Sequence, residues 1–307
     1  MDKVLVLRFS SLGDVILTTA VLKPLYDAGF DVYLMTYKEF APIFEDSSFV
    51  KVLGVDKQNI FKVARSVKSV KPDIVIDLHK NLKTLALRSV LKTTWFSYNK
   101  RSLKRRLCVW FKVFKKERFY ITDEYANAVK PILDIKNSKP YLEVNPDRVE
   151  KFLSSKPVVS LGVGARYDKK RYKYFKELSK MLLEKGFEVR LLGGKDDNVD
   201  AYGINYVGKL SLTEALACVK SSKLVISNDS SITHMARAVG VKVITIFGGT
   251  DPCFGFAPKE DEGIIVSKDM PCKPCDLHGK GVCKYGDYPC LDIEPKFIFD
   301  KAIALLG

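Results

Sequence analysis

The stretch KVLVLRFSSLGDVILTTAVL, residues 3–22, decides the fold class of this chain. It begins with an apolar run, residues 3–9, that has the character of a buried strand, and it continues into an amphipathic pattern, residues 14–29, that predicts a helix closed by Gly29. The next apolar run, residues 31–36, again has strand character. Strand, helix and strand in this order predict a parallel sheet covered by helices, in the α/β class.

The alternation of strand and helix patterns continues along the chain and then starts again. A first series precedes a polar, proline-bearing stretch at residues 137–157, and a second series occupies residues 158–249. We therefore expect two Rossmann-like, doubly wound domains, residues 1–150 and 151–307, with a C-terminal helix at residues 294–307. Such domains hold ligands at the carboxyl ends of their strands, which predicts a cleft across which the two domains face each other.

The composition is that of a globular protein, because 47% of the 307 residues are hydrophobic, enough for two packed domains. Residues 1–7 lack the charged and apolar segments of a signal peptide, and no apolar run approaches the roughly 18 residues of a membrane span. Seven cysteines in a chain of this length do not indicate a disulfide scaffold. We therefore expect a soluble, cytoplasmic protein in a reducing compartment.

The net charge of +15 is concentrated in one segment. Between His79 and Arg118 there are thirteen Lys or Arg residues and one acid, Glu117, and the stretch NKRSLKRRLCVWFKVFKKERF, residues 99–119, mixes cations with aromatic side chains. Two interpretations stay open, a solvated helix face and a patch that binds a polyanion. Apolar residues among the cations favour a membrane surface over a nucleic acid duplex. Because the chain has no helix-turn-helix, RNP or zinc-finger pattern, we expect no nucleic acid partner.

Four predicted strand-to-helix turns carry residues capable of chemistry: FSSLGDV (9–15), GVGARYDKKRY (162–172), SNDSSITH (227–234) and FGGTDP (247–252). Such turns present backbone N–H groups and helix N-termini, which favour anions. None of them completes the G-x-G-x-x-G fingerprint, and no P-loop lysine motif occurs. A dinucleotide dehydrogenase and a P-loop enzyme are therefore disfavoured, and we expect no cofactor.

Asp14 lies in the first turn of the first predicted helix, directly after Gly13. The helix dipole stabilises a carboxylate there by a few tenths to about 1 kcal/mol, whether or not the group does chemistry. Gly13 lets the backbone turn, and the small Ser10 and Ser11 leave room for a substrate. The pattern is therefore compatible with a simple helix cap and with a catalytic carboxylate.

The turn at residues 227–234 contains more polar side chains than a helix cap requires. Asp229 or Ser230 would serve as the cap. In the functional interpretation, the hydroxyls of Ser230 and Ser231 and the helix N–H groups hold a diphosphate, while Asp229 accepts a hydrogen bond from a sugar. His234 lies one turn further along the same helix.

Cations and thiols form two further candidate sites. Lys169, Lys170 and Arg171 precede the first helix of the second predicted domain, where they either bind the same anion or are simply solvated. Four cysteines follow the spacing C-x2-C-x7-C-x6-C: Cys272, Cys275, Cys283 and Cys290. Four thiolates are able to hold a structural zinc ion, although the second pair lacks the close spacing of a zinc knuckle, and disulfides are an alternative.

Together these stretches resemble glycosyltransferase family nine, the bacterial ADP-heptose:lipopolysaccharide heptosyltransferases, over nearly the whole chain. The resemblance is carried, in chain order, by VLRFSSLGDVILTTAVLKPL, DLHKNLKTLALR, GARYDKKRY, SNDSSITHMARAVGVKVITIFGGTDP and CKPCDLHGKGVCKYGDYPCLDIEP. It implies a GT-B fold with the acceptor site in the N-terminal domain and the nucleotide-sugar site in the C-terminal domain. It also implies catalysis without a metal ion.

The resemblance implies roles for particular residues. Asp14 resembles the catalytic base of the family. The positions that would bind the donor are Lys170, Arg166, Asp229, Ser230, Ser231, His234, Thr250 and Asp251. The positions that would bind the acceptor are Ser10, Ser11, Gly13, Lys80, Lys83, Arg101, Lys104 and Arg105. Two positions depart from the family, which commonly has glycine in place of Ser231 and tryptophan-proline in place of Tyr172-Lys173.

The function implied is an inverting, metal-independent transfer of heptose from ADP-heptose to the inner core of lipopolysaccharide. On this hypothesis Asp14 deprotonates the acceptor hydroxyl, while Lys170 and the helix near Asp229 stabilise the leaving ADP. The basic segment would meet an anionic, lipid-linked core oligosaccharide at the cytoplasmic face of the inner membrane. Two alternatives stay open: a transferase of the same fold with another nucleotide-sugar, such as a UDP-hexosamine, and a non-catalytic protein that binds nucleotide-sugars or glycans.

Overall fold

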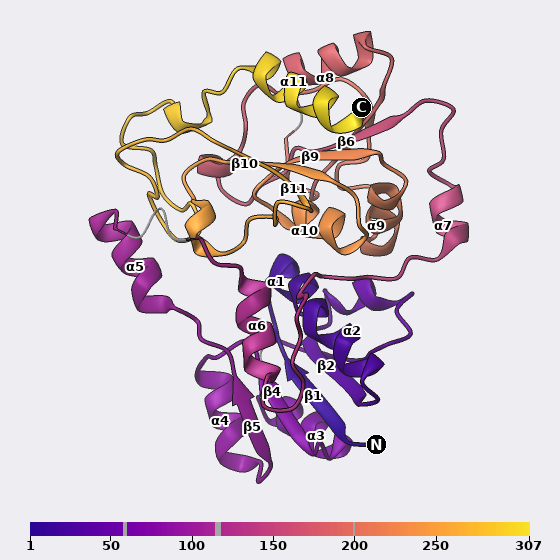
Figure 1. Ribbon diagram of the computed structural model, residues 1–307, viewed down its shortest axis with the longest axis vertical. Coiled ribbons are helices and arrows are strands. Elements are labelled where there is room, and N and C mark those ends of the chain that lie inside the picture. The colour runs from indigo at the N-terminus through magenta and orange to yellow at the C-terminus, as the bar shows by residue number, and fades with distance from the viewer. Residues whose placement is uncertain (58–59, 114–117, 199) are drawn as a thin grey trace. The chain divides into compact units, whose positions relative to one another are not determined.

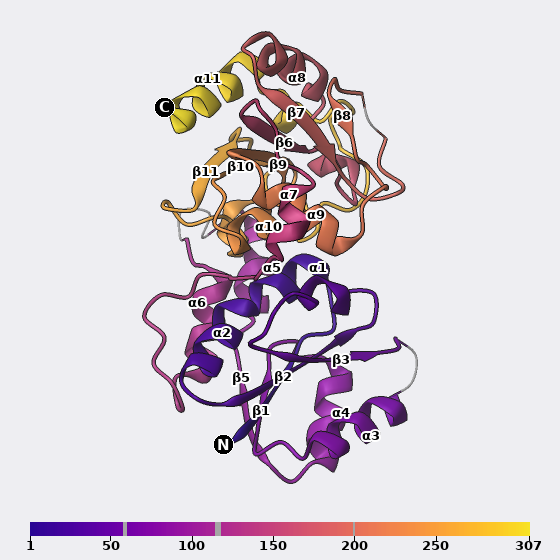
Figure 2. The ribbon, with the colours of Figure 1, turned by 90° about the vertical axis from the view of Figure 1, so that its right-hand side faces the viewer.

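The chain divides into two compact units, each built on one parallel sheet (Figures 1 and 2). The computed structural model describes residues 1–57, 60–113, 118–198 and 200–307. Unit 1 comprises residues 1–100 and 121–144, and unit 2 comprises residues 101–120 and 145–307. Among the described residues, no helix has the length and apolar character needed to cross a bilayer.

Unit 1 has a five-stranded parallel sheet in the order β3-β2-β1-β4-β5. Its strands are β1 (Lys3–Leu7), β2 (Asp31–Tyr37), β3 (Lys51–Val55), β4 (Ile74–Asp77) and β5 (Thr94–Ser97). Its helices are α1 (Leu12–Leu17), α2 (Thr19–Asp27), η1 (Ala41–Phe44), α3 (Ile60–Val70), α4 (Leu82–Val90) and α6 (Ile121–Val129). Helices α2 and α6 cover one face of the sheet, and α3 and α4 cover the other (Figure 2).

Unit 2 has a six-stranded parallel sheet in the order β11-β10-β9-β6-β7-β8. Its strands are β6 (Val158–Gly162), β7 (Glu188–Leu192), β8 (Ile204–Asn205), β9 (Leu224–Asn228), β10 (Val243–Phe247) and β11 (Gly263–Ser267). Its helices are α5 (Ser102–Phe111), α7 (Pro146–Glu150), η2 (Asp168–Lys170), α8 (Phe175–Glu184), α9 (Leu212–Lys220), α10 (Ser231–Ala238), η3 (Pro252–Phe254), η4 (Pro289–Leu291) and α11 (Pro295–Leu306). Helices α8 and α11 lie on one face of the sheet, and α9 and α10 lie on the other (Figure 1).

The predicted fold class is confirmed: both units are doubly wound parallel α/β structures, and the C-terminal helix is α11. The central strands are buried on both faces, as their continuous apolar runs predict; β9 and β10 are buried throughout. Ser211 caps α9 in the predicted capping box with Glu214, since each side chain bonds to the backbone N–H of the other residue.

The helix predicted over residues 14–29 is divided in two at Thr18. The hydroxyls of Thr18 and Thr19 donate to the carbonyls of Val15 and Ile16, each at 2.6 Å. Such hydroxyl groups compete with the main-chain N–H groups of the helix for the same carbonyl oxygens, and this competition bends helices. The predicted end is observed, because Gly29 follows α2 with a φ of +91°, a backbone conformation that glycine adopts without steric cost.

The two units are not divided at residue 150. The chain passes between them at residues 100–101, 120–121 and 144–145, so residues 101–120 group with unit 2 although the sequence placed them in the first domain. The reason is packing, because Cys108 of α5 lies in an apolar cluster with Cys253 and Phe254 of unit 2. A local sequence pattern does not reveal which sheet a connecting helix packs on.

The buried ion pair between Arg237 and Glu262 gives a test of how unit 2 is held together. Both side chains are almost completely buried, and the guanidinium contacts the carboxylate at 2.9 Å, joining α10 to the chain before β11. Arg237→Ala leaves the Glu262 charge buried without its cation, which should cost about 3–5 kcal/mol of the free energy of unfolding, as measured by urea denaturation.

Lys180→Ala is the matched control, because it removes a cation from the exposed Lys180–Glu184 pair of α8, whose charged groups are 3.9 Å apart. This control should leave the urea midpoint nearly unchanged. Similar small losses for the two variants would contradict the structural importance of the buried pair.

Candidate functional site

Each sheet reverses its winding at one point, and the candidate residues follow the strands on either side of it. In unit 1 the reversal lies between β1 and β4, and in unit 2 it lies between β6 and β9. The two connections that leave such neighbouring strands run to opposite faces of the sheet, which opens a crevice at the carboxyl ends. Each unit therefore has one candidate site.

In unit 1, Asp14 is held by two neighbours after β1. Its Oδ1 contacts the Arg8 guanidinium at 2.5 Å, and its Oδ2 accepts hydrogen bonds from the Ser11 hydroxyl at 2.8 Å and the Ser11 N–H at 3.1 Å. Burial by itself raises the pKa of Asp14, but the Arg8 charge and the Ser11 bonds more than offset it, so that the pKa lies below its usual value. Asp14 is thus an ionised carboxylate at neutral pH.

Arg8 was not among the predicted site residues, yet it organises this site. Its guanidinium donates to the carbonyls of Leu78 and Ser10 and lies 3.4 Å from the Tyr98 hydroxyl. Although burial lowers the pKa of Arg8, the Asp14 charge raises it to above its usual value, so Arg8 stays charged. The sequence has a local signal, because this cation follows the last apolar residue of the strand, but its contact with Leu78 depends on the fold.

His79, which follows β4 at the same edge of the sheet, was not predicted. Burial and the positive charges of Arg8 and Lys100 lower its pKa to about 4, so the imidazole is neutral at physiological pH. Its ring meets Phe9 edge-on, with the ring centroids 5.2 Å apart. Within the described part of the chain, its buried Nδ1 has no hydrogen-bond partner.

Five predicted acceptor residues lie in unit 1, in two groups. Ser10, Ser11 and Gly13 surround the start of α1, with the Ser10 carbonyl bonded to Arg8 and Ser11 in the cap position. Lys80 follows β4, and its ammonium donates to the Tyr98 carbonyl at 3.3 Å. Lys83, on α4, instead donates to the carbonyl of residue 57 at 2.5 Å.

The other three predicted acceptor residues belong to unit 2. Arg101 and Arg105 stack on the ring of Phe119, at 4.8 Å and 5.4 Å from its centroid, and Lys104 lies on the same helix, α5. Arg105 also stacks on Phe256, at 5.2 Å. The eight predicted acceptor residues are therefore divided between the two units.

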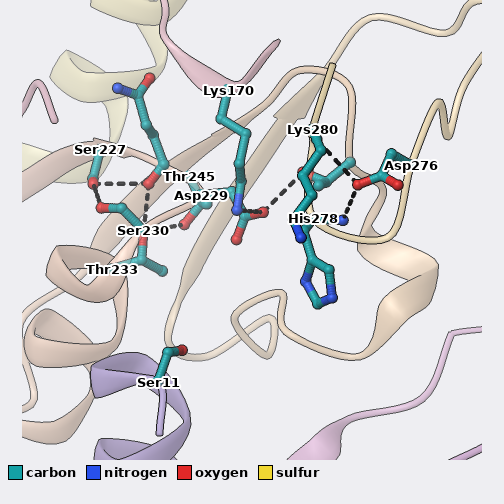
Figure 3. A network of polar contacts seen from close by, with 12 residues as sticks. Ser11, Lys170, Ser227, Asp229, Ser230, Thr233, Thr245, Asp276, His278 and Lys280 are labelled. Atoms are coloured by element: carbon teal, nitrogen blue, oxygen red, sulfur yellow. Dashed lines mark hydrogen bonds and ion pairs between the residues drawn. The ribbon is translucent and has the colours of Figure 1, made fainter. Parts of the chain in front are cut away.

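In unit 2, two predicted donor residues converge on the carboxylate of a third, and we name the three, Lys170, Asp229 and Thr250, the Lys170 cluster. The ammonium of Lys170 lies 2.7 Å from Asp229 Oδ2 (Figure 3). The Thr250 hydroxyl donates to the same oxygen at 2.8 Å. These residues come from three different connections, after β6, β9 and β10. Burial raises the pKa of Asp229, but Lys170 and Thr250 together lower it to below its usual value. Asp229 is therefore ionised, and its charge is balanced by the Lys170 ammonium.

Glycines allow Lys170 to reach Asp229, because the main chains of neighbouring connections come very close to each other at this point. The N–H of Gly249 donates to the Lys169 carbonyl at 2.6 Å, and a Cβ at Gly248 would lie 2.1 Å from the same oxygen. A Cβ at Gly279 would lie 2.9 Å from Cγ of Lys170. Only glycine permits these approaches, which place the Lys170 side chain beside Asp229.

Asn228, the last residue of β9, was not predicted and connects the two strands at the reversal point. Its side chain is fully buried, accepts a hydrogen bond from the Tyr172 N–H at 3.0 Å and donates to the Val163 carbonyl at 2.9 Å. Tyr172, one of the departures from the family pattern, is buried with its hydroxyl bonded to the Ile293 carbonyl at 2.6 Å. Tyr172 therefore has a structural role in unit 2.

The start of α10 resolves the choice of cap. Ser230 occupies the cap position and Ser231 is the first helical residue. In the described part of the chain no side chain accepts a hydrogen bond from the first N–H groups of α10, because the Ser230 hydroxyl contacts Ser227 at 3.2 Å and Asp229 is bonded to Lys170. The helix N-terminus is therefore available to an anionic group.

The remaining predicted donor residues differ in their burial and in their contacts. His234 is buried on α10, with its Nδ1 3.4 Å from a nitrogen of Arg237. Asp251 caps η3 by accepting from the Cys253 N–H at 2.9 Å. Arg166 is exposed and stacks on the neighbouring Tyr167 ring, 5.5 Å from its centroid. Among the described residues, it makes no hydrogen bond or ion pair with Lys170, Asp229 or Thr250.

The loop between Cys275 and Cys283, which carries two of the four cysteines of the predicted zinc site, also lies beside Lys170. Asp276 accepts hydrogen bonds from the N–H groups of His278 at 2.8 Å and Lys280 at 3.0 Å, which folds the loop into a tight turn (Figure 3). Gly279, between them, packs on the Lys170 side chain. The loop thereby places His278 and Lys280 near Lys170.

The four-cysteine zinc site considered from the spacing is not seen. Cys290 is buried in the core of unit 2, and burial together with the neighbouring Cys272 raises the pKa of Cys275 to about 11. Within residues 1–57, 60–113, 118–198 and 200–307, no group of three or more His, Cys, Asp or Glu side chains is arranged to hold a metal ion. The four cysteines are also thiols, so the alternative of disulfides is not observed.

Comparison with known proteins adds independent evidence. The family described as "Glycosyltransferase family 9 (heptosyltransferase)" matches residues 60–285, which is well over half of the chain. Lipooligosaccharide heptosyltransferase 2 of Haemophilus influenzae is 28% identical over 159 residues, a region that covers 43% of this chain and 46% of that protein. The aligned region therefore spans about half the length of this relative.

Two solved structures are similar over essentially the whole chain. A glycosyltransferase family 9 protein from Veillonella parvula superposes with a TM-score of 0.80 at 21% identity, covering 100% of this chain and 98% of that one. The E. coli ADP-heptose lipopolysaccharide heptosyltransferase II superposes with a TM-score of 0.75 at 19% identity, covering 99% and 98%. At these identities the likeness establishes the fold.

The lowered pKa of Asp14 predicts how the stability of unit 1 depends on pH. The Arg8–Asp14 pair stabilises the folded state fully above the unfolded pKa of about 3.9, and this contribution is lost as the pH falls through the lowered folded pKa. The difference in unfolding free energy between the wild type and Asp14→Asn should be constant near neutral pH and should shrink below about pH 4.

Urea denaturation at a series of pH values measures this difference. Asp56→Asn, in the exposed Lys38–Asp56 pair, is the control and should change the stability little at any pH. A pH-independent difference for Asp14→Asn would show that the carboxylate is not held by Arg8.

Proposed function

Because the chain belongs to glycosyltransferase family 9, we propose that it transfers heptose from ADP-heptose to the inner core of lipopolysaccharide. The transfer we propose inverts the anomeric centre and needs no metal ion. The observation that carries the proposal is Asp14, an ionised carboxylate fixed by Arg8 and Ser11 at the reversal point of the first sheet. A carboxylate in such a position suits a general base for a sugar hydroxyl.

The contacts of Asp14 leave lone pairs of its carboxylate for the hydroxyl of the acceptor. Arg8 occupies Oδ1, and Ser11 donates twice to Oδ2, whereas the two oxygens of a carboxylate offer about four lone-pair sites. In the proposed step, one free lone pair takes the proton of the acceptor hydroxyl. The hydroxyl oxygen forms a bond to the anomeric carbon while the bond from that carbon to the diphosphate oxygen breaks, and ADP leaves.

Arg8 would have two effects on this base. It keeps Asp14 deprotonated at physiological pH and fixes the orientation of the carboxylate, but it also lowers its basicity. His79, neutral at physiological pH and with its Nδ1 unsatisfied among the described residues, is suited to accept a hydrogen bond from another acceptor hydroxyl. Lys80, Lys83 and the small Ser10 would complete the acceptor side of unit 1.

On the donor side, the Lys170 cluster and the start of α10 would bind ADP-heptose. Lys170 offers a cation and the first N–H groups of α10 offer donors to the diphosphate, whose charge grows as the sugar leaves. Asp229, with Thr250, would hold Lys170 in place until the donor binds. We further propose that Ser231, Asp251, His234 and Arg166 contribute to this site.

The acceptor would be an anionic, lipid-linked core oligosaccharide, reached at the cytoplasmic face of the inner membrane. The excess of cations supports this choice, since the chain carries 51 Lys or Arg and 36 Asp or Glu residues. A same-fold transferase with a different nucleotide and a non-catalytic binding protein predict other outcomes in the experiments that follow.

Asp14→Asn tests the general base. Asparagine keeps the size and the capping capacity of the side chain but takes no proton, so the rate of heptose transfer should fall by about 10²–10⁴-fold while ADP affinity stays unchanged. The transfer rate is measured with ADP-heptose and a purified core acceptor. Asp27→Asn, which removes an exposed carboxylate of α2, is the control and should keep full activity. Full turnover by Asp14→Asn would overturn the role of Asp14.

Calorimetric titration with ADP, UDP, GDP and NAD, without added metal, tests the donor. ADP should bind best, and Lys170→Met should weaken ADP binding by about tenfold or more, because a cation contacting a diphosphate is lost. Lys173→Met removes a nearby exposed cation and should leave the affinity unchanged.

The calorimetric result also distinguishes the alternatives. A preference for UDP would overturn the donor assignment while keeping the proposed base. ADP binding without transfer to any core acceptor would favour a non-catalytic protein.

A further inference from the structure

The outward face of α5 exposes apolar side chains that a globular protein normally buries. Leu103, Trp110 and Phe111 are 69%, 64% and 68% exposed, and Leu107 is half-buried between them. At 3.6 residues per turn, Leu103, Leu107 and Trp110 fall on one side of the helix, with Phe111 at its margin. We name these four residues the α5 stripe.

The α5 stripe does not serve the packing of α5 on its own unit. The opposite side of the helix does so, because Cys108 and Val109 pack with Cys253 and Phe254. The C-terminal end is fixed separately, by a hydrogen bond of 2.7 Å from the Lys112 ammonium to the Pro274 carbonyl. Helix α5 is therefore fixed on unit 2, and its ribbon lies at the margin of that unit (Figure 1). The side chains of Leu103, Trp110 and Phe111 are exposed there.

The charged residues of α5 and its immediate flanks have one sign. Residues 100–112 contain six Lys or Arg and no Asp or Glu. Arg106, next to the stripe on the helix, is exposed, and so is Arg118 beyond it. Apolar side chains with tryptophan among them, bordered by cations, match the boundary of an anionic bilayer, where apolar atoms enter the acyl region and cations meet phosphates.

We propose that α5 docks unit 2 on an anionic lipid bilayer, with the α5 stripe in the headgroup boundary and Arg106 on the lipid phosphates. The helix has ten residues and is about 15 Å long, so it would lie in the plane of the surface and not span it. This proposal rests on the proposed function only in supposing a lipid-linked acceptor. Docking would hold the enzyme at the surface that contains its acceptor.

The chain provides its own probe for this contact, because it has only two tryptophans, Trp95 and Trp110. Trp95 lies on β5 and packs against the core of unit 1, whereas Trp110 is in the α5 stripe. With vesicles of phosphatidylcholine and phosphatidylglycerol, the Trp110 emission of Trp95→Phe should shift to the blue and be quenched by brominated acyl chains. Trp110→Phe should show neither change, and phosphatidylcholine vesicles alone should bind the protein weakly.

Matched variants distinguish vesicle binding by the α5 stripe from non-specific binding by other exposed side chains. Trp110→Ala combined with Phe111→Ala should lower the vesicle partition coefficient by about tenfold or more in a co-sedimentation assay. Phe297→Ala removes a ring that is 50% exposed on α11 and should leave the partition coefficient unchanged. Arg106→Gln should weaken binding to the anionic vesicles and reduce its salt dependence, whereas Lys185→Gln, an exposed cation after α8, should not.

Three outcomes would overturn the docking proposal. Vesicle binding that persists in the Trp110→Ala, Phe111→Ala double variant would place the contact elsewhere. A blue shift of Trp110 that grows with protein concentration in the absence of vesicles would assign the α5 stripe to a second copy of the chain. An unchanged Trp110 emission with anionic vesicles, in protein that binds ADP normally, would show that the stripe meets no membrane.

A separate readout distinguishes failure of docking from failure of the proposed function. The double variant should keep the ADP affinity of the wild type and its transfer rate to a delipidated core oligosaccharide, and should lose rate only on acceptor embedded in vesicles. Normal docking without transfer to either acceptor would instead overturn the proposed function. Loss of rate on the delipidated acceptor would show that α5 acts on the catalytic site and not on the membrane.

Discussion

The reversal of winding at β1/β4 and at β6/β9 is the constraint on which both candidate sites depend. Connections between parallel strands are right-handed. The face of the sheet that a connection covers therefore depends on which side of the first strand the next strand is added. At the reversal, the two neighbouring connections leave for opposite faces, and the carboxyl ends between them stay uncovered. The connections after β1 and β4 supply Asp14 and His79, and those after β6 and β9 supply Lys170 and Asp229.

Both sites place one carboxylate against one cation in partly buried surroundings. Arg8 with Asp14, and Lys170 with Asp229, keep the carboxylates ionised where burial alone would favour protonation. The environments of the cations differ, because Arg8 is locked by three backbone or hydroxyl acceptors whereas Lys170 is bonded to the carboxylate of Asp229. An arginine held by several acceptors suits the orientation of a base, whereas a lysine paired with a carboxylate suits an exchange of that carboxylate for a phosphate.

Sequence patterns were most informative for the candidate residues next to predicted strand ends. Lys170, Asp229 and Thr250 stand in three separate turns of the sequence, and the parallel sheet brings them onto one oxygen atom. The long basic segment was harder to interpret, because cations appear alike in a sequence whether they stack on an aromatic ring, as Arg101 and Arg105 do on Phe119, or face solvent, as Arg106 does. Arg8 and His79 were missed because their significance depends on neighbours that are distant in the sequence, such as Leu78 for Arg8.

By itself, the sequence determined the α/β class, the parallel sheets, the C-terminal helix and the strand-to-helix turns that hold the candidate residues. Hydrophobic periodicity and turn residues act over a few neighbouring positions, so a local pattern reveals them. Tertiary structure alone decided that α5 belongs to unit 2, that Asp14 is paired with Arg8, and that the late cysteines form no metal site among the described residues. Each of these outcomes depends on atoms that packing brings together from residues far apart, or at opposite ends of a tight turn. Local patterns contain no information about such distances.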